Sequence, residues 1–284
     1  MGLLDGQVVF VTGAARGQGR AHAIASAKQG ADVVLLDLVA DIPTVNYPMP
    51  VEEDLAITVK EVEAAGGRAL SFVGDVRSTE TLDRVVKEAI SEFGKIDSAI
   101  VNAGIWSHAP LWELTDEAWD QMIGINLTGA FKTVRAVARH MISRSSGSIV
   151  LISSVDGMEA GVDYVHYTAS KHGVLGLMKN AALELAPHGV RCNALMPGAT
   201  DTVILDNQDA YDMISGQPGG TRADLIVGAH HYNPLRGVDL LSPMQIADAA
   251  VFLNSPLAAR ITGVALPVDA GHMLVKGWVH EPAM

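Results

Sequence analysis

The chain has 284 residues, of which 49% are hydrophobic, and its 32 acidic side chains outnumber the 20 basic ones, which gives a formal net charge of -12. Because such a field repels phosphates and anionic lipids, we exclude nucleic acid and membrane as partners and expect a small molecule. The single cysteine, Cys192, excludes an intrachain disulfide framework, and since no leader-like or long uncharged apolar run is present we expect a cytoplasmic protein.

Short apolar runs recur along the chain, separated by stretches long enough for helices. They are 8–11, 33–36, 69–73, 99–101, 149–152, 190–195 and 264–268. Most lack an alternating polar residue, and strands that are apolar on both faces belong in a parallel sheet covered by helices on each side. We therefore predict one α/β domain over residues 1–284, with a doubly wound parallel sheet of seven strands, the Rossmann fold.

A glycine-rich turn follows the first predicted strand and opens a helix. We expect Gly13 to permit a tight turn, and Gly17 and Gly19 to let backbone N–H groups approach a pyrophosphate. The pattern alone is weak, because such turns are common between a strand and a helix. The predicted cofactor-binding residues of this turn are Gly13, Arg16, Gly17, Gln18 and Gly19.

The second predicted strand ends at Asp37, where a carboxylate can accept hydrogen bonds from both hydroxyls of an adenosine ribose. A 2′-phosphate there would cost up to ~4 kcal/mol at about 4 Å and an effective dielectric of about 20, which favours NAD over NADP. Arg16 could pair with such a phosphate, but Leu38 adds no second cation. Alternatively, Asp37 is a simple strand-end N-cap. Asp75 and Val76 are predicted near the adenine amino group, although an exposed turn explains Asp75 nearly as well.

Two segments depart from the alternation of strands and helices: a proline-bearing insertion (39–54) and a stretch rich in Gly, Asp and Pro (200–241). We expect loops with short helical pieces, the first closing over the cofactor and the second setting substrate specificity, because long ordered loops are usually functional. Between them, Thr115 is a predicted N-cap of a long helix that runs toward Arg144.

Tyr167 and Lys171 lie four residues apart, hence on one face of a helix. A tyrosine and a lysine at this spacing are too common to indicate a function by themselves. With the glycine turn and with Asn102-Ala103-Gly104, Asn126, Ser154 and Pro197-Gly198 in matching order, the chain resembles the short-chain dehydrogenase/reductase family over nearly its whole length. The proline-bearing insertion and the segment 263–271 resemble, more narrowly, the carveol dehydrogenase-like, mycofactocin-coupled branch of that family.

The resemblance implies an NAD-dependent oxidoreductase acting on CH-OH groups, with Asn126, Ser154, Tyr167 and Lys171 as catalytic residues. As acid/base, Tyr167 must ionise well below its ordinary pKa of ~10, and each unit requires ~1.4 kcal/mol, which Lys171 and a positive nicotinamide would supply. Lys171 would hold the nicotinamide ribose, and Ser154, preferred over Ser153 for its spacing, would bind the substrate oxygen. Asn126 would hold a water on a proton path, or alternatively make an interhelical hydrogen bond.

The resemblance also implies further contacts to the cofactor and the substrate. Asn102, Ala103 and Gly104 would pass the adenosine ribose, and Pro197, Gly198, Thr200 and Thr202 would flank the nicotinamide, although Gly104 and Gly198 could equally be ordinary turn residues. The candidate pocket residues are Ile105, Trp106, His108, Met158, Val162, Tyr164, Val203 and Ile204. Because these are mostly apolar, we predict a hydrophobic, terpenoid or carveol-like secondary alcohol and its ketone, unless they are simple core residues.

None of the 10 histidines has recognisable ligand spacing, so no metal is expected. The resemblance implies a homotetramer that pairs helices near 119–142 and 165–187, and a redox partner that reoxidises NADH in place. The tail 272–284, with Trp278, either reaches a neighbour's pocket or frays. The alternative function is a non-catalytic NAD-binding regulator on the same fold, but a sensor has no need of the predicted proton relay.

Overall fold

The computed structural model describes residues 2–275, and a seven-stranded sheet with the order β3-β2-β1-β4-β5-β6-β7 forms its centre. All neighbouring strands are parallel. The strands are β1 (Val8–Thr12), β2 (Asp32–Asp37), β3 (Ala69–Val73), β4 (Ser98–Val101), β5 (Gly147–Ile152), β6 (Val190–Pro197) and β7 (Ala265–Val268). Each coincides with one of the apolar runs in the sequence, so the predicted doubly wound fold is confirmed.

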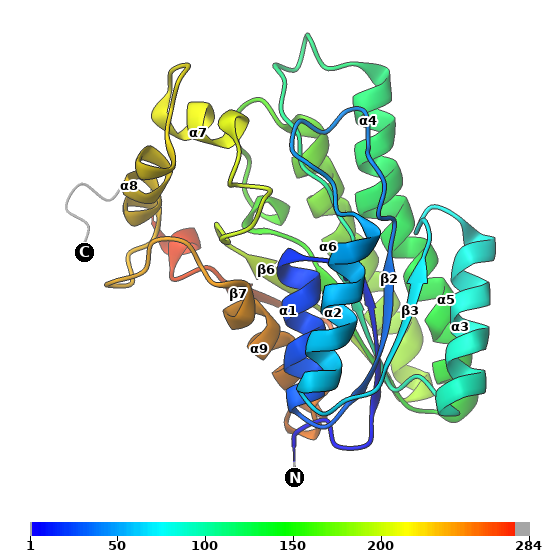
Figure 1. Ribbon diagram of the computed structural model, residues 1–284. Coiled ribbons are helices and arrows are strands. Elements are labelled where there is room, and N and C mark those ends of the chain that lie inside the picture. The colour runs from blue at the N-terminus through cyan, green and yellow to red at the C-terminus, as the bar shows by residue number, and fades with distance from the viewer. Residues whose placement is uncertain (1, 276–284) are drawn as a thin grey trace.

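Helices cover both faces of the sheet (Figure 1). On one face lie α1 (Gly17–Lys28), α2 (Glu52–Ala64) and α9 (Pro243–Asn254). On the other lie α3 (Thr79–Phe93), α4 (Asp116–Ile123), α5 (Ala130–Arg144) and α6 (Val165–Leu185). Successive side chains of a strand point to opposite faces, so Val8 and Phe10 of β1 join one apolar core whereas Val9 and Val11 join the other. This is why the strands are apolar throughout.

The strand order reverses direction at β1, which lies between β2 and β4. In open α/β sheets the crevice outside the carboxyl ends of the strands at such a reversal is the usual ligand site. The turn after β1 and the segment after β4 both emerge there. The topology therefore places the glycine turn beside Asn102, although the two are about 90 residues apart in the chain.

The predicted long helix after Thr115 is interrupted. Thr115 caps α4 by accepting a hydrogen bond from the Ala118 amide at 3.2 Å, as expected. Between α4 and α5, however, the residues Gly124–Gly129 form a π-helix, and Asn126 lies within it. Such wide turns inside helices occur often at functional sites, because they turn a side chain away from the regular helical face.

The two irregular segments differ in content. The residues 39–51 form only turns and loop, because α2 begins at Glu52, so no short helical piece is present in them. The segment 200–241 does contain helices, α7 (Gln208–Ser215) and α8 (Arg222–Tyr232). Within residues 2–275 no helix is long and apolar enough to cross a membrane. The predicted contact of Trp278 lies outside the described residues.

Candidate active site

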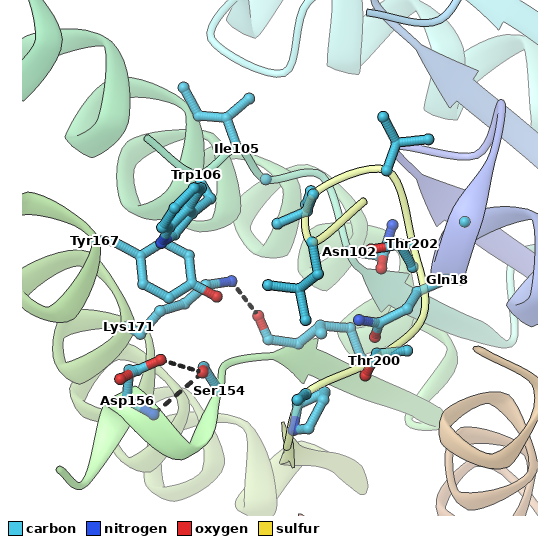
Figure 2. A pocket seen from close by; sticks show the side chains of 18 of the residues that line it. Gln18, Asn102, Ile105, Trp106, Ser154, Asp156, Tyr167, Lys171, Thr200 and Thr202 are labelled. Carbon is cyan, nitrogen blue, oxygen red and sulfur yellow. Dashed lines mark hydrogen bonds between the residues drawn. The ribbon is translucent and has the colours of Figure 1, made fainter. Parts of the chain in front are cut away.

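A cavity of about 1000 Å³ lies at the carboxyl ends of β1, β4, β5 and β6. The glycine turn, the insertion and the segment that follows β6 complete its lining. Figure 2 shows Gln18, Asn102, Ser154, Tyr167 and Lys171, which come from four different parts of the chain, around the same space. The volume is at the upper end of the range of ligand pockets, enough for a large cofactor together with a substrate.

The glycine turn has a conformation that other residues rarely adopt. Gly13 and Gly17 have φ values of +66° and +55°, in the left-handed region. A Cβ on Gly19 would lie 1.8 Å from the Gly13 carbonyl oxygen, so the missing side chain of Gly19 makes room for the turn itself. Gly17 instead faces the cavity, with the nearest atom 3.4 Å away on Thr202. The backbone of Gly17 therefore borders the cavity with no side chain of its own, beside Thr202.

Asn102 holds the turn against the end of β4. Its side-chain nitrogen donates to the carbonyl oxygens of Thr12 at 3.0 Å and Gly13 at 3.1 Å. The Thr12 hydroxyl in turn accepts from the backbone amides of Asn102 and Ala103. These hydrogen bonds fix the cradle before any ligand arrives, which lowers the entropic cost of binding.

Asp37 ends β2 and is 8% exposed. Its carboxylate accepts the backbone N–H of Ala15 at 2.9 Å and of Val39 at 3.1 Å. Burial raises the pKa of Asp37, while these hydrogen bonds and the Arg16 charge oppose the shift. Since each carboxylate oxygen can accept two hydrogen bonds, both keep capacity for ribose hydroxyls. The N-cap alternative is wrong, because α1 is capped at Arg16 and α2 at Val51. Asp37 instead braces the turn and also lines the cavity.

The remaining predicted cofactor residues also line the cavity: Arg16, Leu38, Asp75, Val76, Ala103, Gly104, Pro197, Gly198, Thr200 and Thr202. The Asp75 carboxylate already accepts hydrogen bonds from the Arg77 guanidinium at 2.7 and 2.9 Å, so only part of its accepting capacity is left for a ligand. Burial raises the pKa of Asp75, but the hydrogen bonds and charge of Arg77 more than reverse this and leave it lowered. Asp75 is therefore a paired turn residue at the edge of the cavity.

Tyr167 and Lys171 project into the cavity from consecutive turns of α6 (Figure 2). The Lys171 ammonium lies 5.4 Å from the centre of the Tyr167 ring and donates to the Ile152 carbonyl oxygen at 3.0 Å. Lys171 is only 5% exposed, and burial lowers its pKa to about 8, against the opposing charge of Asp156. The ammonium form still predominates at neutral pH.

The surroundings of Tyr167 shift its pKa in the direction opposite to that required of a base. Burial and the Asp156 carboxylate raise the pKa of Tyr167, and the hydrogen bond with Ser154 offsets only part of the effect. The prediction of a low pKa requires Lys171 together with a positive nicotinamide, and it stays a prediction. The phenol is held protonated by the chain's own groups.

The two adjacent serines have different partners. Ser153 donates to the Lys171 carbonyl oxygen at 2.9 Å and is satisfied within the protein. The Ser154 hydroxyl donates to Asp156 at 3.1 Å and accepts from the Asp156 amide at 3.1 Å (Figure 2). Of the two serines, only Ser154 contributes to the pKa of Tyr167, and the choice of Ser154 as the catalytic serine stays a prediction.

Asn126 is 2% exposed and lies behind the cavity wall rather than in its lining. Its side-chain amide makes two hydrogen bonds with the backbone of Ile105: the oxygen accepts from the N–H at 2.9 Å, and the nitrogen donates to the carbonyl oxygen at 3.0 Å. It also donates to Ser170 of α6 at 3.2 Å, which is the interhelical hydrogen bond of the alternative interpretation. A Cβ on Gly104 would lie 3.4 Å from the Asn126 oxygen and 3.6 Å from the Lys171 nitrogen, so Gly104 leaves the space between them open.

Most of the candidate substrate residues line the cavity: Ile105, Trp106, Val162, Tyr164, Val203 and Ile204. The structure places His108 and Met158 outside it. The His108 ring lies against Trp106 at 5.4 Å, with its Nε2 3.8 Å from Asp209. Met158 is 57% exposed. Position in sequence alone does not fix the direction in which a loop side chain points.

Tyr47 of the insertion was not recognised from the sequence, although it lines the cavity. It is 6% exposed, its hydroxyl accepts the Trp106 backbone N–H at 3.1 Å, and burial raises its pKa to about 12. Thr44 donates to Gln121 of α4 at 2.7 Å, and Asn46 donates to Asp209 of α7 at 2.8 Å. The insertion is thus fastened across the cavity. A bulky aromatic residue in a proline-bearing loop was the available signal.

Polar residues beyond Ser154 were also missed. Tyr164 donates to Asp156 at 3.3 Å, and Nε2 of His272 lies 2.6 Å from Glu159. Asp156, Glu159 and His272 all line the cavity. Two acids close behind Ser154 in the sequence were the available signal. Within residues 2–275, no group of three or more His, Cys, Asp or Glu side chains is placed to hold a metal ion.

A nucleotide cradle and a tyrosine–lysine pair that share one cavity define a dinucleotide-dependent oxidoreductase. The sequence matches the short chain dehydrogenase family over residues 7–212, and the chain belongs to that family. The predicted family, fold and enzyme class are confirmed.

Named relatives agree with this assignment. The chain is 42% identical to the (-)-trans-carveol dehydrogenase of Rhodococcus erythropolis, over 96% of this chain and 100% of the relative. The crystal structure of carveol dehydrogenase from Mycobacterium avium in complex with NAD is 38% identical, with a TM-score of 0.93 over 97% of this chain and 100% of that one. A short chain dehydrogenase from Mycobacterium paratuberculosis bound to NAD is 36% identical, with a TM-score of 0.87 over 96% and 100%. The prediction of NAD agrees with the cofactor in both structures.

Proposed function

We propose that the protein interconverts a hydrophobic, carveol-like secondary alcohol and its ketone, with NAD as cofactor and Tyr167 as acid/base. The observation that carries the proposal is that Tyr167 and Ser154 line the same cavity as Gly17 and Asp37. The apolar side chains beside them suit an alicyclic substrate. The similarity to a carveol dehydrogenase supports the same substrate class.

The residues present fit NAD. The backbone of Gly17, which borders the cavity without a side chain, suits a pyrophosphate, and the Asp37 carboxylate suits the adenosine ribose. Gln18 lines the cavity, and its buried Oε1 has no partner among residues 2–275, so it can accept a hydrogen bond from a ligand. Lys171 would hold the nicotinamide ribose. When bound, oxidised NAD accepts a hydride from the substrate carbon and brings a positive charge into the cavity.

Each catalytic side chain then has a stated task. Ser154 turns its hydroxyl from Asp156 to the substrate oxygen and stabilises the charge that grows there. Tyr167 takes the hydroxyl proton of the alcohol, or gives a proton to the ketone in reverse. The Lys171 ammonium favours the phenolate. Asn126 keeps Ile105 and Gly104 in place, so that the space between its own oxygen and Lys171 remains open for a proton-carrying water.

The insertion over residues 39–51 would retain the cofactor. Its anchors to α4, to α7 and to Trp106 support closure over the cavity. We propose that bound NADH exchanges slowly and is reoxidised in place by a redox partner, as in the mycofactocin-coupled branch. We also propose a homotetramer that pairs α4, α5 and α6, since Trp119, Phe131 and Leu183 on these helices are exposed. Light scattering of the purified protein tests the assembly.

The function is tested by incubating the purified protein with carveol and NAD⁺ and following NADH absorbance without an artificial electron acceptor, and the reduction of the acceptor when one is added. Turnover only with the acceptor supports retained cofactor, whereas turnover with free NAD⁺ supports the activity and contradicts retention. If no secondary alcohol reduces NAD⁺ under either condition, the proposed activity is wrong and the regulator becomes the better assignment.

A further inference from the structure

The substrate part of the cavity is not uniformly apolar. Trp106, Val203 and Ile204 give it an apolar wall, but the carboxylates of Asp156 and Glu159 line it as well. A carboxylate beside apolar side chains loses much of its hydration, and this costs free energy unless hydrogen-bond donors replace the water. Whether the protein itself supplies enough hydrogen-bond donors to these two carboxylates therefore affects which substrates the cavity binds.

The donors differ between the two acids. Glu159 is paired with His272 at 2.6 Å and keeps 39% of its side chain exposed, so it is both satisfied and hydrated. Asp156 is partly buried and depends on two hydroxyls, those of Ser154 at 3.1 Å and of Tyr164 at 3.3 Å. Burial and the nearby Glu159 carboxylate raise the pKa of Asp156, whereas the hydrogen bonds from Ser154 and Tyr164 lower it.

The proposed reaction removes one of the two donors. A serine hydroxyl has a single proton, so Ser154 cannot donate to the substrate oxygen and to Asp156 at the same time. When Ser154 turns to the substrate, Oδ2 of Asp156 loses its side-chain donor. For a partly buried carboxylate, losing a hydrogen-bond donor without a replacement costs free energy. A donor on the substrate itself, close to the reacting carbon, would restore the lost bond.

We propose that Asp156 is a specificity-determining residue that accepts a hydrogen bond from a second hydroxyl group of the substrate. The inference rests on the proposed function and narrows its substrate class to apolar, ring-bearing diols and the matching hydroxy ketones. The second hydroxyl lies near the carbinol carbon, because Oδ2 of Asp156 is 3.1 Å from the Ser154 oxygen that would hold the reacting group. A hydrogen bond from this hydroxyl also disperses the negative charge of Asp156, which opposes the ionisation of Tyr167.

A matched pair of alcohols tests the proposal: menthol, and menthoglycol, which has the same ring and one additional tertiary hydroxyl that cannot be oxidised to a ketone. With wild-type protein and NAD⁺ we expect kcat/KM to be at least about tenfold higher for menthoglycol, the effect of one hydrogen bond to a charged group. Asp156→Asn keeps the shape and removes the charge, and should lower this preference about tenfold. Glu61→Gln, on the exposed face of α2, is the control and should keep it.

Binding is measured in parallel, as the rise in melting temperature of the NAD⁺ complex when each alcohol is added. The binding measurement tests the role of Asp156 even if neither alcohol is oxidised. A lack of oxidation would count against the proposed function, not against the role of Asp156 in binding. A larger rise with menthoglycol that Asp156→Asn abolishes supports the role of Asp156. Equal rises with the two alcohols would overturn it.

A purely structural role for Asp156 has a different signature. If Asp156 only orients Ser154, Asp156→Asn lowers kcat for both alcohols by the same factor and leaves their ratio unchanged, which contradicts the proposal. Asp156→Ala gives the same comparison if circular dichroism shows that the Asn variant does not fold.

Discussion

The hydrogen bond from the Trp106 backbone to Tyr47 ties the insertion to the cavity wall, and Tyr47→Phe removes it with little change of shape. The bond is 3.1 Å long and buried, so the variant leaves the Trp106 N–H without its acceptor. An unsatisfied buried donor costs about 1–3 kcal/mol, which at 1.4 kcal/mol per factor of ten raises the open population of the insertion about 5-fold to 140-fold. The contacts of Thr44 and Asn46 remain and keep the segment attached.

If the insertion must open before the cofactor leaves, the dissociation rate of NADH rises by a factor in the same range. Stopped-flow fluorescence measures that rate, and hydrogen exchange of residues 39–51 measures opening directly. Ser143→Ala is the control, because the exposed Ser143 hydroxyl donates to the His140 carbonyl oxygen within α5, and α5 makes no hydrogen bond with the insertion among residues 2–275. Faster hydrogen exchange with an unchanged NADH dissociation rate would refute the gating argument. Unchanged exchange would refute the anchoring argument.

Three other substitutions test separate parts of the structure. Tyr167→Phe should lower kcat at least about 100-fold while the Kd for NAD⁺ stays nearly constant, and retained turnover would exclude Tyr167 as the acid/base. Asp37→Ser removes the charge opposed to a 2′-phosphate, so the kcat/KM ratio of NADP⁺ to NAD⁺ should rise at least about tenfold. Burial lowers the pKa of His22 from 6.5 to about 3, so the unfolded chain alone takes up a proton between these values. The contribution of neutral His22 to the free energy of unfolding is therefore full above pH 6.5 and is lost as the pH falls toward 3. Urea unfolding of wild type and of a His22 variant should differ in their loss of stability between about pH 7 and pH 5 by about 2 kcal/mol, the contribution of His22. His22→Gln should remove this contribution, and His188→Gln on the surface should not.

The fold could be predicted because its strands are apolar on both faces. Val8 to Val11 fill two cores at once, and only a sheet covered on both sides offers two cores. The glycine turn could be predicted for a similar reason, since its φ values exclude most other residues. Asp37 follows from its place at the end of a strand beside that turn.

Features that depend on contacts distant in sequence were not predictable. The insertion has no periodic pattern, and the direction of Tyr47 is set by the Trp106 amide, 59 residues away. His108 and Met158 lie outside the cavity because neighbouring loops, not spacing, orient them. The π-helix around Asn126 leaves no signal in an otherwise regular helical pattern. Irregular backbone and loop side chains take their positions from tertiary partners.

The environment of Tyr167 shows how far spacing can mislead about chemistry. The spacing of Tyr167 and Lys171, four positions apart, predicts a phenol beside an ammonium, and the structure places them so. The pKa of Tyr167 is nevertheless raised, because burial and the Asp156 carboxylate disfavour the phenolate. The chain therefore holds the phenol in its protonated form, the form that gives a proton to a ketone. Oxidation of an alcohol needs the opposite form, which the positive charge of bound NAD⁺ and the proposed hydroxyl donor at Asp156 would both favour.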